Sequence, residues 1–127
     1  MLMSAALVFI GGGIGAAARE AFMLLLHQYS SAFPIDIFAA NILASFVLGI
    51  VTALHRAHNV SDHVTLLVGT GFAGGMSTFS SYIYGSYSEM TTAGHMALGL
   101  LYIVLSLIIG FGAAWVGISA VPRAPRS

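Results

Sequence analysis

A run of glycines and hydroxyl residues interrupts a hydrophobic stretch that is otherwise long enough to cross a lipid bilayer. Residues 71–82 read GFAGGMSTFSSY. Unpaired backbone groups are costly in hydrocarbon, so irregular chain at that depth survives only where protein buries it or where it lines a polar pathway. We therefore predict that the third of four apolar segments is a helix broken near residues 74–78, and that this break is the functional region.

The whole chain has the composition of a membrane protein. Of its 127 residues, 58% are hydrophobic and 6% are charged, and the mean hydropathy is +0.95. A soluble domain carries about 25% charged residues. The net charge of zero argues against nucleic-acid binding, and the absence of cysteine excludes thiol catalysis and disulfides.

The apolar segments and the residues between them predict a single all-α transmembrane domain over residues 1–127. Pro34 suits a first helical turn, Ser61 is a good N-cap, and Pro122 follows the last apolar segment. This length accommodates about four spans of ~20 residues. The four predicted transmembrane helices cover residues 3–27, 34–55, 62–89 (with the break) and 96–120.

Positive charges near the ends of spans normally set membrane orientation, and here they are sparse. Arg56, Arg123 and Arg126 would lie on the side of the termini, whereas Arg19 lies within the first span. This weak asymmetry leaves two interpretations open. Either the chain inserts in both orientations and forms an antiparallel homodimer, or it inserts with a weak preference for its N-terminus inside.

Small and polar residues mark faces that do not favour lipid. Gly11 and Gly15 have GxxxG spacing, which predicts close approach of another helix backbone. In the second span Asn41, Ser45, Gly49 and Thr52 share one helical face. The Asn41 amide needs partners for two donors and two acceptor sites. It either makes an interhelical hydrogen bond or lines a conduction path.

Aromatic rings and hydroxyls follow the break. Phe79 and Tyr82 lie three residues apart, next to a row of hydroxyls that includes Ser81. A ring has a negative face and a positive edge, so two rings presented edge-on stabilise an anion without a full charge. An aromatic pair at this spacing is also compatible with simple packing.

In combination, these motifs resemble the Fluc (CrcB) family of fluoride channels over essentially the whole chain. The resemblance rests on Gly12, Gly15 and Arg19, on Asn41 with Gly49, and on the segment 71–82. It implies a passive, highly selective fluoride channel that exports fluoride to relieve its toxicity. It also implies dual-topology homodimers of four-helix subunits, with two pores, in the inner (plasma) membrane.

The resemblance assigns roles to individual residues. Phe79 and Tyr82 would present ring edges to fluoride and Asn41 would donate its amide, while Ser80 and Ser81 would belong to the adjoining polar track. Tyr82 stands where the family usually has Phe. Its ring edge is retained, but the phenol adds a donor and bulk, so the conduction rate is left open.

The resemblance also implies a structural sodium ion at the dimer centre, held by the main-chain carbonyls of Gly74 and Ser77. A hard cation with oxygen ligands suits carbonyls freed by a helix break. Arg19 either faces a vestibule that attracts anions or is neutralised by Glu20. Tyr102 of the fourth span either reaches the pore or packs between helices. No organic cofactor is implied.

Two other functions fit a chain of this size. A small proton-coupled multidrug exporter would use Glu20 as its buried carboxylate, but it leaves the break unexplained. A non-conducting assembly subunit would use only the glycine faces. An enzyme is not expected, because no serine has a credible general base nearby and no glycine-rich loop leads to a phosphate site.

Overall fold

Every regular element is a helix in residues 1–30 and 33–122, the part of the chain that this computed structural model describes. This confirms the predicted all-α class. Arg123 and Arg126, part of the predicted charge bias, lie outside the described residues. The elements are α1 (Leu2–Leu26), η1 (His27–Tyr29), α2 (Ile35–Arg56), α3 (Asp62–Val64), η2 (Thr65–Ala73), α4 (Gly74–Met76), α5 (Phe79–Thr91) and α6 (Met96–Ser119).

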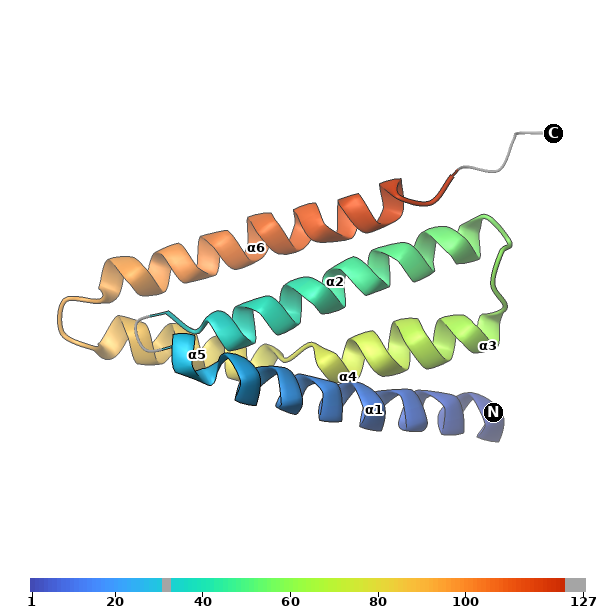
Figure 1. The fold of residues 1–127 in the computed structure, drawn as a ribbon, viewed down its shortest axis with the longest axis horizontal. Helices are drawn as coiled ribbons and strands as arrows, with labels where there is room; N and C mark the ends of the chain where they lie inside the picture. The colour runs from blue at the N-terminus through green and yellow to red at the C-terminus, as the bar shows by residue number, and fades with distance from the viewer. Residues whose placement is uncertain (31–32, 123–127) are drawn as a thin grey trace.

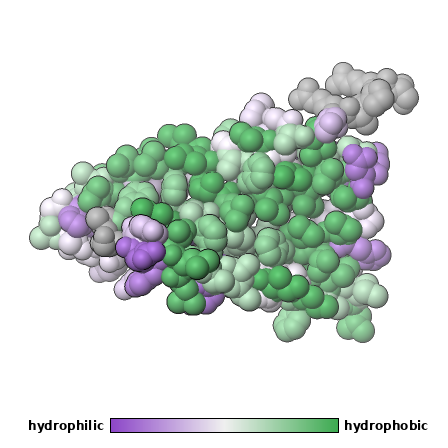
Figure 2. Space-filling view, in the orientation of Figure 1, coloured by the Kyte–Doolittle hydropathy of each residue, from purple (hydrophilic) through white to green (hydrophobic). Residues whose placement is uncertain are grey.

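Three stretches of helix are long and apolar enough to cross a membrane. They are Leu2–Tyr29, Ile35–Arg56 and Met96–Ser119, of 28, 22 and 24 residues. At about 1.5 Å per residue each exceeds the ~30 Å hydrocarbon core. Their outward side chains are large and apolar, and Figure 2 shows hydrophobic residues covering most of the face in view. The chain is therefore a multi-pass membrane protein.

The helices lie side by side along one long axis (Figure 1). α2 packs chiefly against α6, and α1 packs chiefly against η2 and α4. The start of α1, the end of α2, the start of α3 and the end of α6 all lie at one end of the molecule, and α5 lies toward the other end (Figure 1). The elements α3, η2, α4 and α5 form a row beside α1.

The break in this row is shorter than the sequence predicts. The segment from Asp62 to Met76 is helical, and Ser61 begins it as the predicted N-cap, accepting the Val64 N–H at 3.4 Å. Between Met76 and Phe79 the helix is interrupted by two residues with extended backbone, Ser77 and Thr78, with ψ values of 146° and 113°. Residues 74–76 stay helical because Gly75 packs against α1 within this helix rather than forming a turn.

Glycines bring the backbones of α1 and the third segment into contact, as their GxxxG spacing predicts. A Cβ atom on Gly11 would collide with the Leu67 carbonyl oxygen, and one on Gly15 with the Phe72 carbonyl oxygen. Backbone carbonyls cannot move aside as flexible side chains can. Any larger residue at these positions would therefore push α1 away from the break.

This contact predicts opposite effects for two neighbouring substitutions. Replacing a helical Gly by Ala normally stabilises by about 0.5–1 kcal/mol. Gly13→Ala should do so, because no other heavy atom lies within 4 Å of its Cβ position. Gly15→Ala should instead destabilise by about 1–3 kcal/mol, the usual cost of overpacking. Unfolding of the purified protein in mixed detergent micelles measures both, and equal stability of the two variants would contradict the packing described.

Candidate functional site

The side chain of Asn41, on α2, makes hydrogen bonds to both residues of the break, Ser77 and Thr78. Its Oδ1 accepts hydrogen bonds from the Thr78 N–H at 2.7 Å and from the Ser77 hydroxyl at 3.0 Å. Its Nδ2 donates to the Thr78 carbonyl oxygen at 3.2 Å. The amide thus replaces the backbone partner that a continuous helix would give Thr78. This is the interhelical role that the sequence left open for Asn41.

Because the Thr78 N–H bonds to Asn41, a carbonyl before the break loses its usual helical hydrogen-bond donor. In a continuous helix the Thr78 N–H would donate to the Gly74 carbonyl four residues earlier. Here that N–H is directed to Asn41 instead. The next carbonyl, that of Gly75, accepts a hydrogen bond from Arg19 Nη1 at 3.2 Å. The end of α4 therefore presents carbonyl oxygens, one of them already bound by a cation.

Thr78 fixes the start of α5, a role that was not predicted from the sequence. Its Oγ1 accepts the Ser81 N–H at 3.2 Å, which is an N-cap hydrogen bond, and its hydroxyl donates to Ser81 Oγ at 3.0 Å. Ser80 Oγ lies 3.4 Å from the same hydroxyl. A Thr directly before a helical pattern is a recognisable N-cap signal. Three hydroxyls are thereby grouped at the start of α5.

The aromatic residues continue from this point in a row. Phe79 is 75% exposed, and its ring centroid lies 6.1 Å from that of Tyr82. The Tyr82 ring lies 5.4 Å from that of Tyr102 on α6. Tyr102 is fully buried and makes an edge contact with Phe33 at 5.2 Å. The structure thus brings Phe79, Tyr82 and Tyr102 together.

Two hydroxyls on α6 are buried without a hydrogen-bond partner among the described residues. They belong to Tyr102 and to Ser106, one turn further along. Ser106 lies four residues after Tyr102 and therefore on the same helical face, which is the sequence signal that could have identified it. Ser45 of α2 is satisfied, because its hydroxyl donates to the Asn41 carbonyl at 2.9 Å. Polar groups therefore extend from the break along the α2–α6 contact.

Other predicted residues lie around the break. Gly74 and Ser77 are exposed, and no other heavy atom lies within 4 Å of a Cβ built on Gly74. Arg19 is half-buried against the Gly75 carbonyl, while Glu20 is exposed. Among the ion pairs of the described residues, none joins Arg19 to Glu20. The contact seen for Arg19 is therefore with α4, directly before the break, rather than with its neighbour Glu20.

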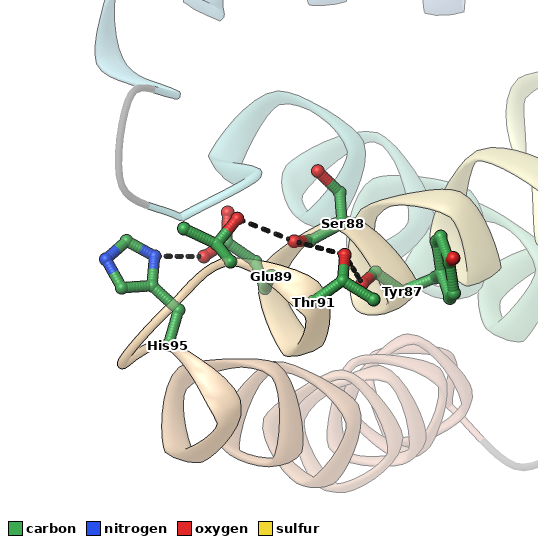
Figure 3. A network of polar contacts seen from close by, with 6 residues as sticks. Tyr87, Ser88, Glu89, Thr91 and His95 are labelled. Atoms are coloured by element: carbon green, nitrogen blue, oxygen red, sulfur yellow. Dashed lines mark hydrogen bonds and ion pairs between the residues drawn. The ribbon is translucent and has the colours of Figure 1, made fainter.

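A separate network of polar contacts lies at the C-terminal end of α5, shown in Figure 3. His95 Nδ1 lies 3.0 Å from Glu89 Oε2, across the turn between α5 and α6. The Thr91 hydroxyl lies 2.9 Å from the Tyr87 carbonyl oxygen and 3.2 Å from that of Ser88. These contacts cap α5 and hold the connection to α6.

The fold and site define a small multi-pass membrane protein whose polar groups gather at a helix break. Residues 6–118 match the family described as CrcB-like protein, Camphor Resistance (CrcB). The chain belongs to this family, as the sequence motifs indicate.

Curated relatives extend this match over most of the chain. The chain is 42% identical to Fluoride-specific ion channel FluC 3 of Yersinia pseudotuberculosis, over 92% of the chain and 87% of that protein. It is 35% identical to Fluoride-specific ion channel FluC of Gloeothece citriformis, over 92% and 95%. With FluC 2 of Brucella melitensis the identity is 40%, over 87% of the chain and 42% of that longer protein. These relatives are named as channels, so the family is one of channels and not of enzymes.

The hydrogen bonds of Asn41 predict a large effect on stability. Asn41→Leu keeps the side-chain size but leaves the Thr78 N–H and the Ser77 hydroxyl without their partner. Thr78 is buried whereas Ser77 is exposed, so the free energy of unfolding should fall by about 1–3 kcal/mol, the cost of one buried unsatisfied group. Thr52→Val on the same helix is the control, because that hydroxyl bonds only to Leu48 of its own helix. It should change stability by less than about 0.5 kcal/mol. Equal losses in a detergent unfolding assay would contradict this role of Asn41.

Proposed function

We propose that this protein is a passive, highly selective fluoride channel that exports fluoride and so relieves its toxicity. A small anion holds its water strongly, so a narrow path must replace that water with hydrogen-bond donors and ring edges. Donors of this kind are concentrated at the break. The fluoride-channel names of the relatives support the same ion.

The observation that carries the proposal is the geometry of Asn41. A primary amide has two N–H donors, and the described residues accept only one of them, through the Thr78 carbonyl oxygen. The second N–H is available to an anion. Because Asn41 holds Thr78 by both its N–H and its carbonyl, it also fixes the residue directly before Phe79. One side chain thus provides a donor and positions an aromatic ring.

The remaining predicted residues form the rest of the proposed path. The edges of Phe79 and Tyr82 contact fluoride, and the hydroxyls of Ser80 and Ser81 continue the polar track. Tyr102 contributes its hydroxyl, which is buried and lacks a partner in the described residues. Arg19, at the break, supplies positive potential that draws anions toward a vestibule. Its hydrogen bond to the Gly75 carbonyl keeps this charge near the break.

We further propose that four segments cross the inner (plasma) membrane and that two copies pair in antiparallel orientation, with two pores at their interface. The broken row of α3 to α5 is the additional crossing. A single chain leaves the Phe79 ring three-quarters exposed and leaves open space beside Gly74. A second copy covering this face would enclose the ring and complete a narrow path.

A structural sodium ion at the centre of this dimer is part of the proposal. The Gly74 carbonyl has lost the Thr78 N–H that would bind it in a continuous helix, and the Ser77 carbonyl belongs to extended backbone. Oxygen atoms without amide partners are the ligands that a hard cation prefers. Two copies would contribute these carbonyls together. The ion would hold the two breaks against each other.

A proton-coupled exporter receives less support. Its carboxylate must be shielded from water and change its charge during transport. An exporter that relies on Glu20 leaves the break held by Asn41 without a role. The family match and the names of the relatives also indicate a channel.

Fluoride release from liposomes, followed with a fluoride-selective electrode, tests the function and the site together. The unaltered protein should release fluoride without a proton gradient and release little chloride. Asn41→Asp removes the amide donors and adds a negative charge, and Phe79→Ile removes a ring edge. Each should slow release by at least about tenfold, the equivalent of one charge-assisted hydrogen bond.

The control for Phe79→Ile is Phe9→Ile, which removes an 83% exposed ring from α1. It should leave fluoride release unchanged. Because Phe79 is largely exposed in the single chain, its substitution should not prevent folding, and size-exclusion chromatography checks this. Unchanged release in both site variants would refute the site assignment. Absence of fluoride release from the unaltered protein would refute the function.

A further inference from the structure

A groove outside the proposed pore lies between the C-terminal ends of α2 and α6. The groove is open on one side and has a volume of about 770 Å³. Its lining combines a guanidinium, an indole ring, a hydroxyl and apolar walls. The residues that line it include Ala53, Arg56, Trp115, Ile118, Ser119 and Pro122.

The position of the groove matches the level of lipid headgroups. α2 and α6 are two of the helices long enough to cross a membrane, and both end at the same end of the molecule (Figure 1). Trp and Arg at the ends of spans characteristically lie at the membrane–water interface. Trp115 is 63% exposed, so its ring is accessible from outside the helix bundle. A ligand of this groove would therefore come from the membrane interface.

The positive charge in the groove is available to a phosphate. Arg56 is exposed, and the ion pairs found in residues 1–30 and 33–122 do not include it. The carboxylate that follows it in the chain, Asp62, lies 3.7 Å from His55 Nε2 instead. A guanidinium presents paired N–H donors that match phosphate oxygens.

The other polar groups of the groove favour a cation. Two helices end here, and the C-terminal end of a helix carries partial negative charge. The Ile118 carbonyl would normally accept from the amide four residues later, but that residue is Pro122, which has no N–H. The face of Trp115 also attracts a cation. A simple anion would be repelled by the partial negative charge of two helix ends. A zwitterion could place its negative group at Arg56 and its positive group at the helix ends and the Trp115 ring.

We propose that this groove binds the headgroup of a phospholipid that carries a phosphate and a primary ammonium, the ethanolamine class. The phosphate accepts hydrogen bonds from Arg56. The ammonium donates to the Ile118 carbonyl and lies against the Trp115 ring. The acyl chains follow the exposed apolar surface of α6. This inference needs only the membrane setting and does not depend on which ion the protein conducts.

Native mass spectrometry of the full chain, released from detergent with added lipids of identical acyl chains, tests the proposal. Phosphatidylethanolamine should be retained more strongly than phosphatidylcholine, whose ammonium has no N–H, and than phosphatidylglycerol, which has no ammonium. Inorganic phosphate should not displace it. Equal retention of the three lipids, or displacement by inorganic phosphate, would overturn the proposal, and neither comparison requires a variant.

Two variants locate the site. Arg56→Gln should weaken retention of phosphatidylethanolamine by about tenfold, the value of one charge-assisted hydrogen bond. Trp115→Leu should weaken it by about threefold, as expected for a cation–π contact at an exposed site. Phe9→Leu, which removes an exposed ring from α1, is the control and should have no effect. Retention by Arg56→Gln equal to that of the unaltered protein would place the lipid elsewhere.

Discussion

The hydrogen bonds between Asn41 and the backbone of Thr78 are the interaction on which the rest of this structure depends. Inside a membrane, a helix can stop only where other groups take over its backbone hydrogen bonds. Asn41 does this with one amide, accepting from the Thr78 N–H and donating to its carbonyl. The break, the start of α5 and the position of Phe79 all follow from this contact.

Close packing of glycines holds the other side of the break. Gly11 and Gly15 let α1 approach the backbone of η2 and α4, and this brings Arg19 within 3.2 Å of the Gly75 carbonyl. In lipid, such contact relies on van der Waals packing and polar groups rather than on burial of apolar surface from water. The break is therefore held between two helices, by a hydrogen-bonded amide on α2 and by backbone contact with α1. A site built on packed helices is positioned more precisely than one built on a free loop.

The sequence predicted the helical class and the family, because apolar segment length and the motif of residues 71–82 are local signals. It predicted the region of the break but not its length, since whether Gly74 to Met76 remain helical depends on packing against α1. It also left two roles open for Asn41, whose partner Thr78 lies 37 residues away and cannot be identified from spacing. The role of Thr78 as the N-cap of α5 was not predicted, although a Thr directly before a helical pattern is a recognised N-cap signal. The roles in fluoride and sodium binding, and the antiparallel dimer, remain predictions.

The central claim is that the amide which holds the break also binds the conducted ion. Fluoride is itself the NMR-active ¹⁹F nucleus, so solid-state NMR of ¹⁵N-asparagine-labelled protein in bilayers measures this directly. We expect a bound ¹⁹F signal with dipolar coupling to Asn41 Nδ2, lost in Asn41→Asp and unaffected by excess chloride. A bound ¹⁹F signal that has no coupling to Asn41, and that persists in Asn41→Asp, would contradict it.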